Sequence, residues 1–246
     1  MKYLFDYSSF ITENKFYQSE LCPNFWKDGE FDEEVRTKLL KIAQDFYSDL
    51  DITIPIIDIQ LTGSLANYNW NKYSDLDVHV IMDMSQINPD IELVKKGLDG
   101  VRSIWNQRHP VVIREHDVEL YAQDIRQLHM ASGLYSLLKG EWIRKPEYDP
   151  PTIDPKDVSR KVEAYGTEIN NLKKKLKGAS PEEAQTIMTY AGALKKKISR
   201  ARDEKLAYKG GEFSVENLVF KEMRNNGMFG DLIDIRSQAY SLIYSE

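Results

Sequence analysis

The first regular pattern along the chain is an amphipathic stretch over 33–49. Apolar side chains recur there every three or four residues, at Val35, Leu39, Ile42 and Phe46. This spacing places them on one face of a helix, and Asp32 is a residue type that caps helix N-termini. The pattern predicts a helix that packs one face against a core.

Apolar runs typical of strands follow. The segment ITIPIIDIQLTGS (52–64) is rich in β-branched residues and ends in Gly-Ser, which indicates a buried strand that enters a tight turn. Alternation predicts a second strand over 76–82, and a long strand or hairpin arm is expected over 111–122. Between them we expect a helix over 90–107, ahead of Pro110.

Everything after this arm is predicted to be helical. Pro151 and Pro155 mark a boundary near position 150. Ser180 is followed by Pro181 and two glutamates, a combination typical of a helix start. Helices are expected over 157–177, from Ser180 toward Tyr208, and from Ser214 to Gly227.

These elements predict an α+β fold, with a small mixed sheet, flanking helices and a C-terminal helical bundle. We expect the core with its N-terminal helices to span residues 1–130. The C-terminal helical region is expected over residues 131–246.

Composition adds that the chain is a globular protein of ordinary hydrophobicity. Of its 246 residues, 41% are hydrophobic and 29% are charged, and no run approaches the roughly 20 apolar residues of a membrane span. The N-terminal stretch is too polar for a secretory signal, so we expect a cytoplasmic location and no membrane partner. Cys22 is the single cysteine, which excludes an internal disulfide and, with scattered histidines, a zinc site.

The charge is distributed unevenly along the chain. Residues 1–125 carry 12 basic and 22 acidic side chains, whereas residues 126–246 carry 21 and 17. The runs Lys173–Lys177 and Lys195–Arg202 concentrate the positive charge. They are interpreted either as solvated helix faces or as a surface that attracts RNA or a triphosphate.

Candidate chemistry is concentrated in QLTGSLANYNWNKYSDLDVHVIMD (60–83). Asp75 and Asp77 are two residues apart in an extended segment, so they share one face while apolar residues form the other. Two carboxylates this close repel each other unless a cation compensates, and hard oxygen ligands favour Mg²⁺ or Mn²⁺. An isolated D-x-D pattern is nevertheless more often a turn and a solvated strand position.

Gly63 and Ser64 give this pattern its second part. They end the preceding strand, where a tight turn presents backbone N–H groups and a hydroxyl to an anion. A turn that holds phosphates, opposite carboxylates that hold a metal, is the arrangement that in-line attack on an α-phosphate requires.

Gly-Ser, ten residues, then Asp-x-Asp resembles the signature of the DNA polymerase beta-like nucleotidyltransferase superfamily, especially its minimal members. The resemblance covers roughly residues 50–125. It implies a palm built on the mixed sheet, an NTP donor, Mg²⁺ or Mn²⁺, and a third carboxylate from a later strand. Glu119 is preferred for that role because apolar residues flank it, and Asp117 is the alternative on the same face. Asp75, Asp77 and Glu119 are then the catalytic and metal-binding residues.

The nucleotide-binding residues expected on this basis are Gly63, Ser64, Lys72 and Ser74. The polar and aromatic loop 67–73 is interpreted either as a contact for a base or acceptor or as a self-packed surface loop. His79 lines the pocket or lies beneath it. A cation among Lys139, Arg144 and Lys145, or in Lys195–Arg202, is hypothesised to contact the triphosphate.

The function expected from the sequence is metal-dependent transfer of a nucleoside monophosphate to a hydroxyl. Neither the phosphate loop G-x-x-x-x-G-K-[ST] nor the dinucleotide turn G-x-G-x-x-G occurs in the chain. The acceptor is open: the basic half slightly favours an RNA end, and a protein or a small molecule is the other option. The alternative function is a non-catalytic nucleotide-sensing or protein-interaction module on the same fold.

Overall fold

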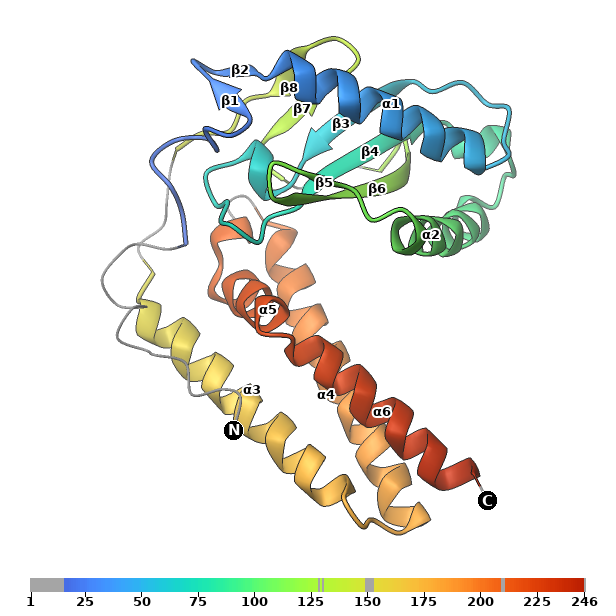
Figure 1. Cartoon of the computed structure of the whole chain (residues 1–246), viewed down its shortest axis with the longest axis vertical. Helices are drawn as coiled ribbons and strands as arrows, with labels where there is room; N and C mark the ends of the chain where they lie inside the picture. The colour runs from blue at the N-terminus through green and yellow to red at the C-terminus, as the bar shows by residue number, and fades with distance from the viewer. Residues whose placement is uncertain (1–15, 128, 130, 149–152, 209–210, 246) are drawn as a thin grey trace. The chain divides into compact units, whose positions relative to one another are not determined.

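The computed structural model describes residues 16–127, 129, 131–148, 153–208 and 211–245. The chain divides into two compact units, Met1–Asp149 and Pro150–Glu246 (Figure 1). The first unit contains a mixed sheet flanked by helices, and the second is helical. The coarse α+β expectation therefore agrees with the observed fold.

Unit 1 is built around a six-stranded sheet of order β5-β6-β4-β3-β7-β8. Strands β4 and β6 are parallel and are joined through α2, whereas the other neighbours are antiparallel. The elements are β1 (Trp26–Lys27), β2 (Glu30–Phe31), α1 (Glu33–Asp49), β3 (Asp58–Thr62), η2 (Ser64–Ala66), β4 (Leu76–Met82), η3 (Met84–Gln86), α2 (Ile91–Arg108), β5 (Val112–Ile113), β6 (His116–Asp124), β7 (Leu134–Ser136) and β8 (Glu141–Arg144). Helix α1 has the predicted bounds, and its Asp32 side chain accepts a hydrogen bond from the Val35 N–H.

The core of unit 1 lies on one face of the sheet. Alternation along β3, β4 and β6 turns Leu61, Val78 and Leu120 to this face, where all three are fully buried. They pack in one cluster with the apolar residues of α1 and α2, which flank the sheet in Figure 1. The other face of the same strands carries mainly polar side chains. The core residues and the candidate functional residues therefore lie on opposite faces of the sheet.

Residues 131–148 were expected to belong to the C-terminal helical region. Instead they contain β7 and β8 and belong to unit 1. The break between units therefore falls at 149/150 and not at 130/131. Tyr135 pairs with Leu61 on β3, and an aromatic cluster stabilises the added strands. The Trp26 and Trp142 rings stack at 4.4 Å, and Tyr135 meets Trp26 edge to face at 5.2 Å. These contacts join segments distant in sequence and override local propensity.

Unit 2 consists of α3 (Pro155–Leu176), α4 (Pro181–Leu206), η4 (Gly211–Phe213), α5 (Val215–Asn225) and α6 (Met228–Tyr244). The predicted helical bundle is confirmed, as are the helix starts after Ser180 and Ser214, whereas α3 begins at Pro155 and not at 157. Helices α4 and α6 run alongside each other (Figure 1). Among the described residues, no helix has the length and apolarity needed to cross a bilayer.

The Ser180 N-cap of α4 is expected to contribute to the stability of unit 2. Its hydroxyl accepts from the Glu183 N–H, and the Glu183 carboxylate accepts from the Ser180 N–H, which forms a capping box. Ser180→Ala should lower the free energy of unfolding by about 1 kcal/mol. Urea unfolding followed by helical circular dichroism measures this loss. Ser237→Ala, on the exposed surface of α6, should be neutral or slightly stabilising; equal losses in both variants would contradict the capping argument.

Candidate functional site

A row of polar side chains crosses the sheet at the start of β4. The register places Thr62 of β3 beside Asp77 of β4, and Asp77 beside Glu119 of β6. Direct neighbours in a sheet point to the same face, and adjacent strands lie about 4.8 Å apart. The two carboxylates are therefore neighbours on the polar face. Both are partly exposed.

Gly63 brings its backbone against the Asp77 carboxylate. Its φ of 77° and ψ of −159° lie in a region that only glycine adopts readily. A Cβ atom at this position would lie 2.0 Å from the Asp77 Oδ2 atom, so the carboxylate occupies the space that a side chain would need. The backbone of the Gly-Ser turn is thus packed directly against the Asp77 side chain.

The other two candidate acids, Asp75 and Asp117, each precede Asp77 and Glu119 by two residues in the sequence. Leu76, the first residue of β4, pairs with Val118, which follows Asp117. Asp75 directly precedes β4, and strand alternation extended by one residue would put it on the face of Asp77 and Glu119. Asp75 is partly exposed and Asp117 is exposed. Among the described residues, however, no three His, Cys, Asp or Glu side chains converge as a ready metal-binding group. The Asp77–Glu119 pair is assembled, and a complete three-carboxylate site is not.

A second polar row lies directly behind the first. Gln60, His79 and Tyr121 are register neighbours, and the Tyr121 hydroxyl donates a hydrogen bond of 2.5 Å to Glu119 Oε2. Burial raises the pKa of the Tyr121 phenol, and the charges of Asp77 and Glu119 raise it further. The phenol therefore stays protonated and remains a donor. Sequence reasoning missed Tyr121, although strand alternation from Glu119 places it on the same face.

His79 has the partners of a structural histidine. Its Nδ1 atom lies 2.5 Å from the Gln123 Oε1 atom, while the Gln123 amide nitrogen donates to the Gln127 carbonyl. That amide orientation places a proton on Nδ1. Burial, followed by the charge of His129, lowers the pKa of His79 to about 3. Its ring is neutral and stacks on Tyr121 at 4.5 Å, so the structure supports the interpretation in which His79 lies beneath the site.

The two predicted serines are buried and bonded to each other. Ser64 Oγ donates to Ser74 Oγ at 2.9 Å, and the Asn71 N–H donates to the same Ser74 oxygen at 2.9 Å. The Ser74 carbonyl lies 2.6 Å from Nδ1 of the buried His116. This network closes the 64–74 loop against β6. Direct contact of Ser64 or Ser74 with a nucleotide stays a prediction.

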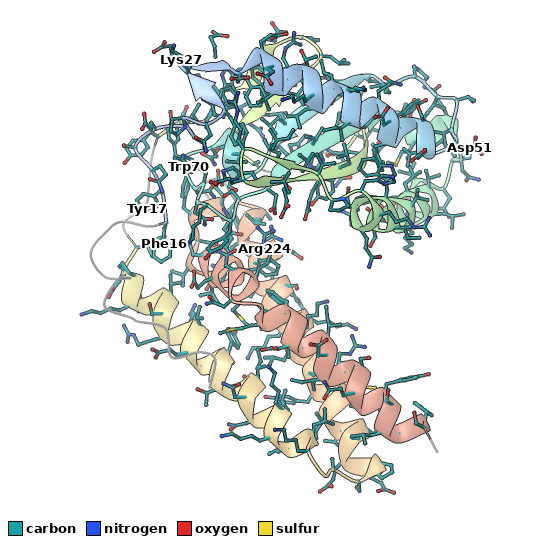
Figure 2. All side chains as sticks on the ribbon, in the orientation of Figure 1. Phe16, Tyr17, Lys27, Asp51, Trp70 and Arg224 are labelled. Carbon is teal, nitrogen blue, oxygen red and sulfur yellow. The ribbon has the colours of Figure 1, made fainter. Side chains whose placement is uncertain are left out.

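Tyr68 and Trp70 of the 67–73 loop pack on the protein itself, whereas Tyr73 is exposed. The Trp70 indole donates to the Glu20 carbonyl, and the Tyr68 carbonyl accepts from the Gln18 N–H. Figure 2 shows Trp70 on the side of the unit that also carries Tyr17. These contacts favour the surface-loop interpretation for Tyr68 and Trp70. Lys72 is exposed, with its Nζ atom 4.9 Å from the Tyr73 ring, and its phosphate contact stays a prediction.

Arg144 is engaged with the backbone. Its guanidinium donates to the carbonyls of His129, Ala131 and Ser132. The side chain therefore holds the segment between β6 and β7, which includes the His129 ring edge-on to His79 at 5.0 Å. Lys139 and Lys145 are exposed. A role for any of the three in triphosphate binding stays a prediction.

Comparisons with protein-family models, curated proteins and solved structures found no match to this chain.

Proposed function

We propose that this protein is a metal-dependent nucleotidyltransferase that moves a nucleoside monophosphate from an NTP to a hydroxyl acceptor. The observation that supports this most is the pairing of Asp77 with Glu119, directly beside a turn whose backbone conformation only glycine adopts readily. Neighbouring carboxylates cost repulsion that a purely structural sheet has no reason to keep. A bound cation offsets that cost.

The donor set fits Mg²⁺ or Mn²⁺ in chemical class. Carboxylate oxygens are hard ligands, and Mg²⁺ is commonly held by one or two carboxylates together with substrate phosphates. Asp77 and Glu119 would hold it, with Asp75 as the proposed third ligand. The chemistry that such an ion supplies is neutralisation of phosphate charge and a lowered pKa of the attacking hydroxyl.

The chain's own residues would bind and orient the reactants. The backbone at Gly63 and Ser64 is proposed to face the β- and γ-phosphates, and the polar sheet face lies under the α-phosphate. The acceptor oxygen forms a bond to the α-phosphorus, the bond to pyrophosphate breaks, and the hydroxyl proton is released. Electrostatic positioning of this kind is the main contribution that proteins make to phosphoryl-group chemistry.

One observation favours the alternative of a non-catalytic nucleotide-binding module. No three potential ligands converge among the described residues, so the acids are not arranged as a finished metal centre. A sensing module would bind nucleotide at the same polar face of the sheet without releasing pyrophosphate. Covalent labelling of an acceptor distinguishes the two functions, because only a transferase gives a covalent product.

The test is transfer of α-phosphate label from each of the four NTPs to a mixture of total RNA and cell lysate, with Mg²⁺ or Mn²⁺. We expect label on one acceptor class, and its loss with EDTA or in Asp75→Ala/Asp77→Ala. Glu34→Ala/Asp45→Ala, which removes two exposed carboxylates from α1, should retain transfer. Metal-dependent nucleotide binding without any labelled product would replace the transferase with the binding module.

A further inference from the structure

Tyr121 is hydrogen-bonded to Glu119. The two lie on the same face of β6, two residues apart, and the Tyr121 hydroxyl donates to Glu119 Oε2. A glutamate has one more rotatable bond than an aspartate and needs more restraint to hold a ligand oxygen in place. The phenol provides this restraint at one carboxylate oxygen and leaves Oε1 for another contact.

The Tyr121 ring is held by its neighbours. The His79 ring stacks on it with an interplanar angle of 12°, and the Arg102 guanidinium carbon lies 4.7 Å from its centroid. The Arg102 Nε atom is buried without a hydrogen-bond partner and lies 3.8 Å from Asp99 Oδ1, so the guanidinium has both this ion pair and the aromatic contact. Contacts from β4 and α2 therefore restrict the direction in which the hydroxyl points.

The backbone between the two residues is also fixed. The Asn106 amide of α2 donates to the Leu120 carbonyl and accepts from the Leu120 N–H, each at 3.1 Å. Leu120 is the residue between Glu119 and Tyr121, and its side chain is fully buried. Helix α2 thus holds both the strand backbone and the aromatic ring.

We propose that Tyr121 is the positioning residue for Glu119, and that the Arg102–Tyr121–Glu119 series orients this carboxylate for the metal ion of the proposed reaction. The inference rests on the proposed function, because it assigns Glu119 as a ligand. Residues that hydrogen-bond to metal ligands typically change metal affinity or activity by about 10- to 100-fold when they are removed.

The test compares Tyr121→Phe with the wild-type chain. The variant keeps the ring and removes only the hydroxyl, so we expect the Kd for Mn²⁺, measured from the free-ion signal in electron paramagnetic resonance, to rise about 10- to 100-fold. In the transfer assay, the Mg²⁺ activation constant should rise by a similar factor while the KM for NTP at saturating Mg²⁺ stays unchanged. Excess metal should therefore restore the rate.

Tyr190→Phe is the matched control. The Tyr190 hydroxyl donates to the Glu168 carboxylate in unit 2, so this variant removes the same type of hydrogen bond elsewhere. It should leave the Mn²⁺ Kd unchanged. Arg102→Leu is the second variant if Tyr121→Phe does not fold, and it should weaken Mn²⁺ binding in the same direction but less.

The outcomes separate this inference from the proposed function. Transfer by the wild-type chain with an unchanged Mn²⁺ Kd in folded Tyr121→Phe would overturn the inference alone. Selective loss of Mn²⁺ affinity in a chain that shows no transfer would support the positioning role and count against the transferase. Failure of the wild-type chain to bind Mn²⁺ would overturn both.

Discussion

Alanine in place of Gly63 is expected to lower nucleotidyl transfer by at least about 100-fold while unit 1 stays folded. The added Cβ would lie 2.0 Å from the Asp77 Oδ2 atom and 2.9 Å from its Cγ atom, so the carboxylate has to rotate away. A misplacement of about 1 Å in a catalytic site can cost a factor on this order. The unusual backbone conformation adds a stability cost of about 1–3 kcal/mol.

Gly227→Ala separates the effect on transfer from the effect on stability. Gly227 also has a positive φ, of 72°, but no heavy atom lies within 4 Å of the position of its Cβ. Its replacement should lower stability without changing the transfer rate or the Mn²⁺ affinity. Initial rates and urea midpoints of both variants test this. If Gly63→Ala retained full Mn²⁺ affinity and rate, the turn would have no part in placing Asp77.

Gly133→Ala is expected to destabilise unit 1 strongly, because Gly133 lies directly against the Ala66 backbone. The Cβ would lie 1.7 Å from the Ala66 carbonyl oxygen and 2.8 Å from its carbonyl carbon, and a backbone cannot yield as a side chain can. The Gly133 carbonyl also accepts from the buried Thr62 hydroxyl, so movement breaks a second contact. We expect a loss of about 3 kcal/mol or more.

Tryptophan fluorescence during urea unfolding measures this loss in unit 1, because all four tryptophans lie before residue 150. Gly100→Ala is the control, and it is expected to change the stability in the opposite direction. Gly100 lies in α2 with no heavy atom near its Cβ position, so alanine should stabilise the helix by about 0.5–1 kcal/mol. A Gly133→Ala variant as stable as the wild-type chain would contradict the close backbone approach.

The parts of the fold that could be predicted from the sequence are those encoded locally. The α1 periodicity and the Ser180 and Ser214 caps depend on side chains within a few residues, and the structure confirms them. Strands β7 and β8 were missed because β7 has three residues and its partner on β3 lies more than 70 positions earlier. Such a strand is stabilised by nonlocal pairing rather than by its own pattern.

The candidate site also has features that are encoded locally and features that depend on nonlocal pairing. Strand alternation placed Asp75 with Asp77, and Asp117 with Glu119, but alternation within one strand contains no information about its neighbour. The register that sets Asp77 beside Glu119 depends on the β4–α2–β6 connection as a whole. The preference for Glu119 over Asp117 is consistent with that register, and its role as a metal ligand stays a prediction.

The sequence could not reveal how the predicted phosphate residues would be used within the fold. Ser64 and Ser74 look equally available in the sequence, yet their hydroxyls are bonded to each other. Tyr121 looked like an ordinary strand residue, yet it contacts Glu119. Both differences arise because hydrogen-bond partners are selected by tertiary packing, after strands and loops have been brought together.

The strand order also has a consequence for synthesis of the chain. In the finished sheet β3 lies between β4 and β7, but β7 is more than 70 residues farther along the chain. On the ribosome, β3 can pair with β4 early and then has an unpaired edge until residues 134–136 emerge. That edge belongs to a strand in which apolar Ile59 and Leu61 alternate with polar residues, and an unpaired strand edge can associate with other chains. Pairing of β7 with β3 then covers this edge, and the nascent chain is exposed to association with other chains until that point.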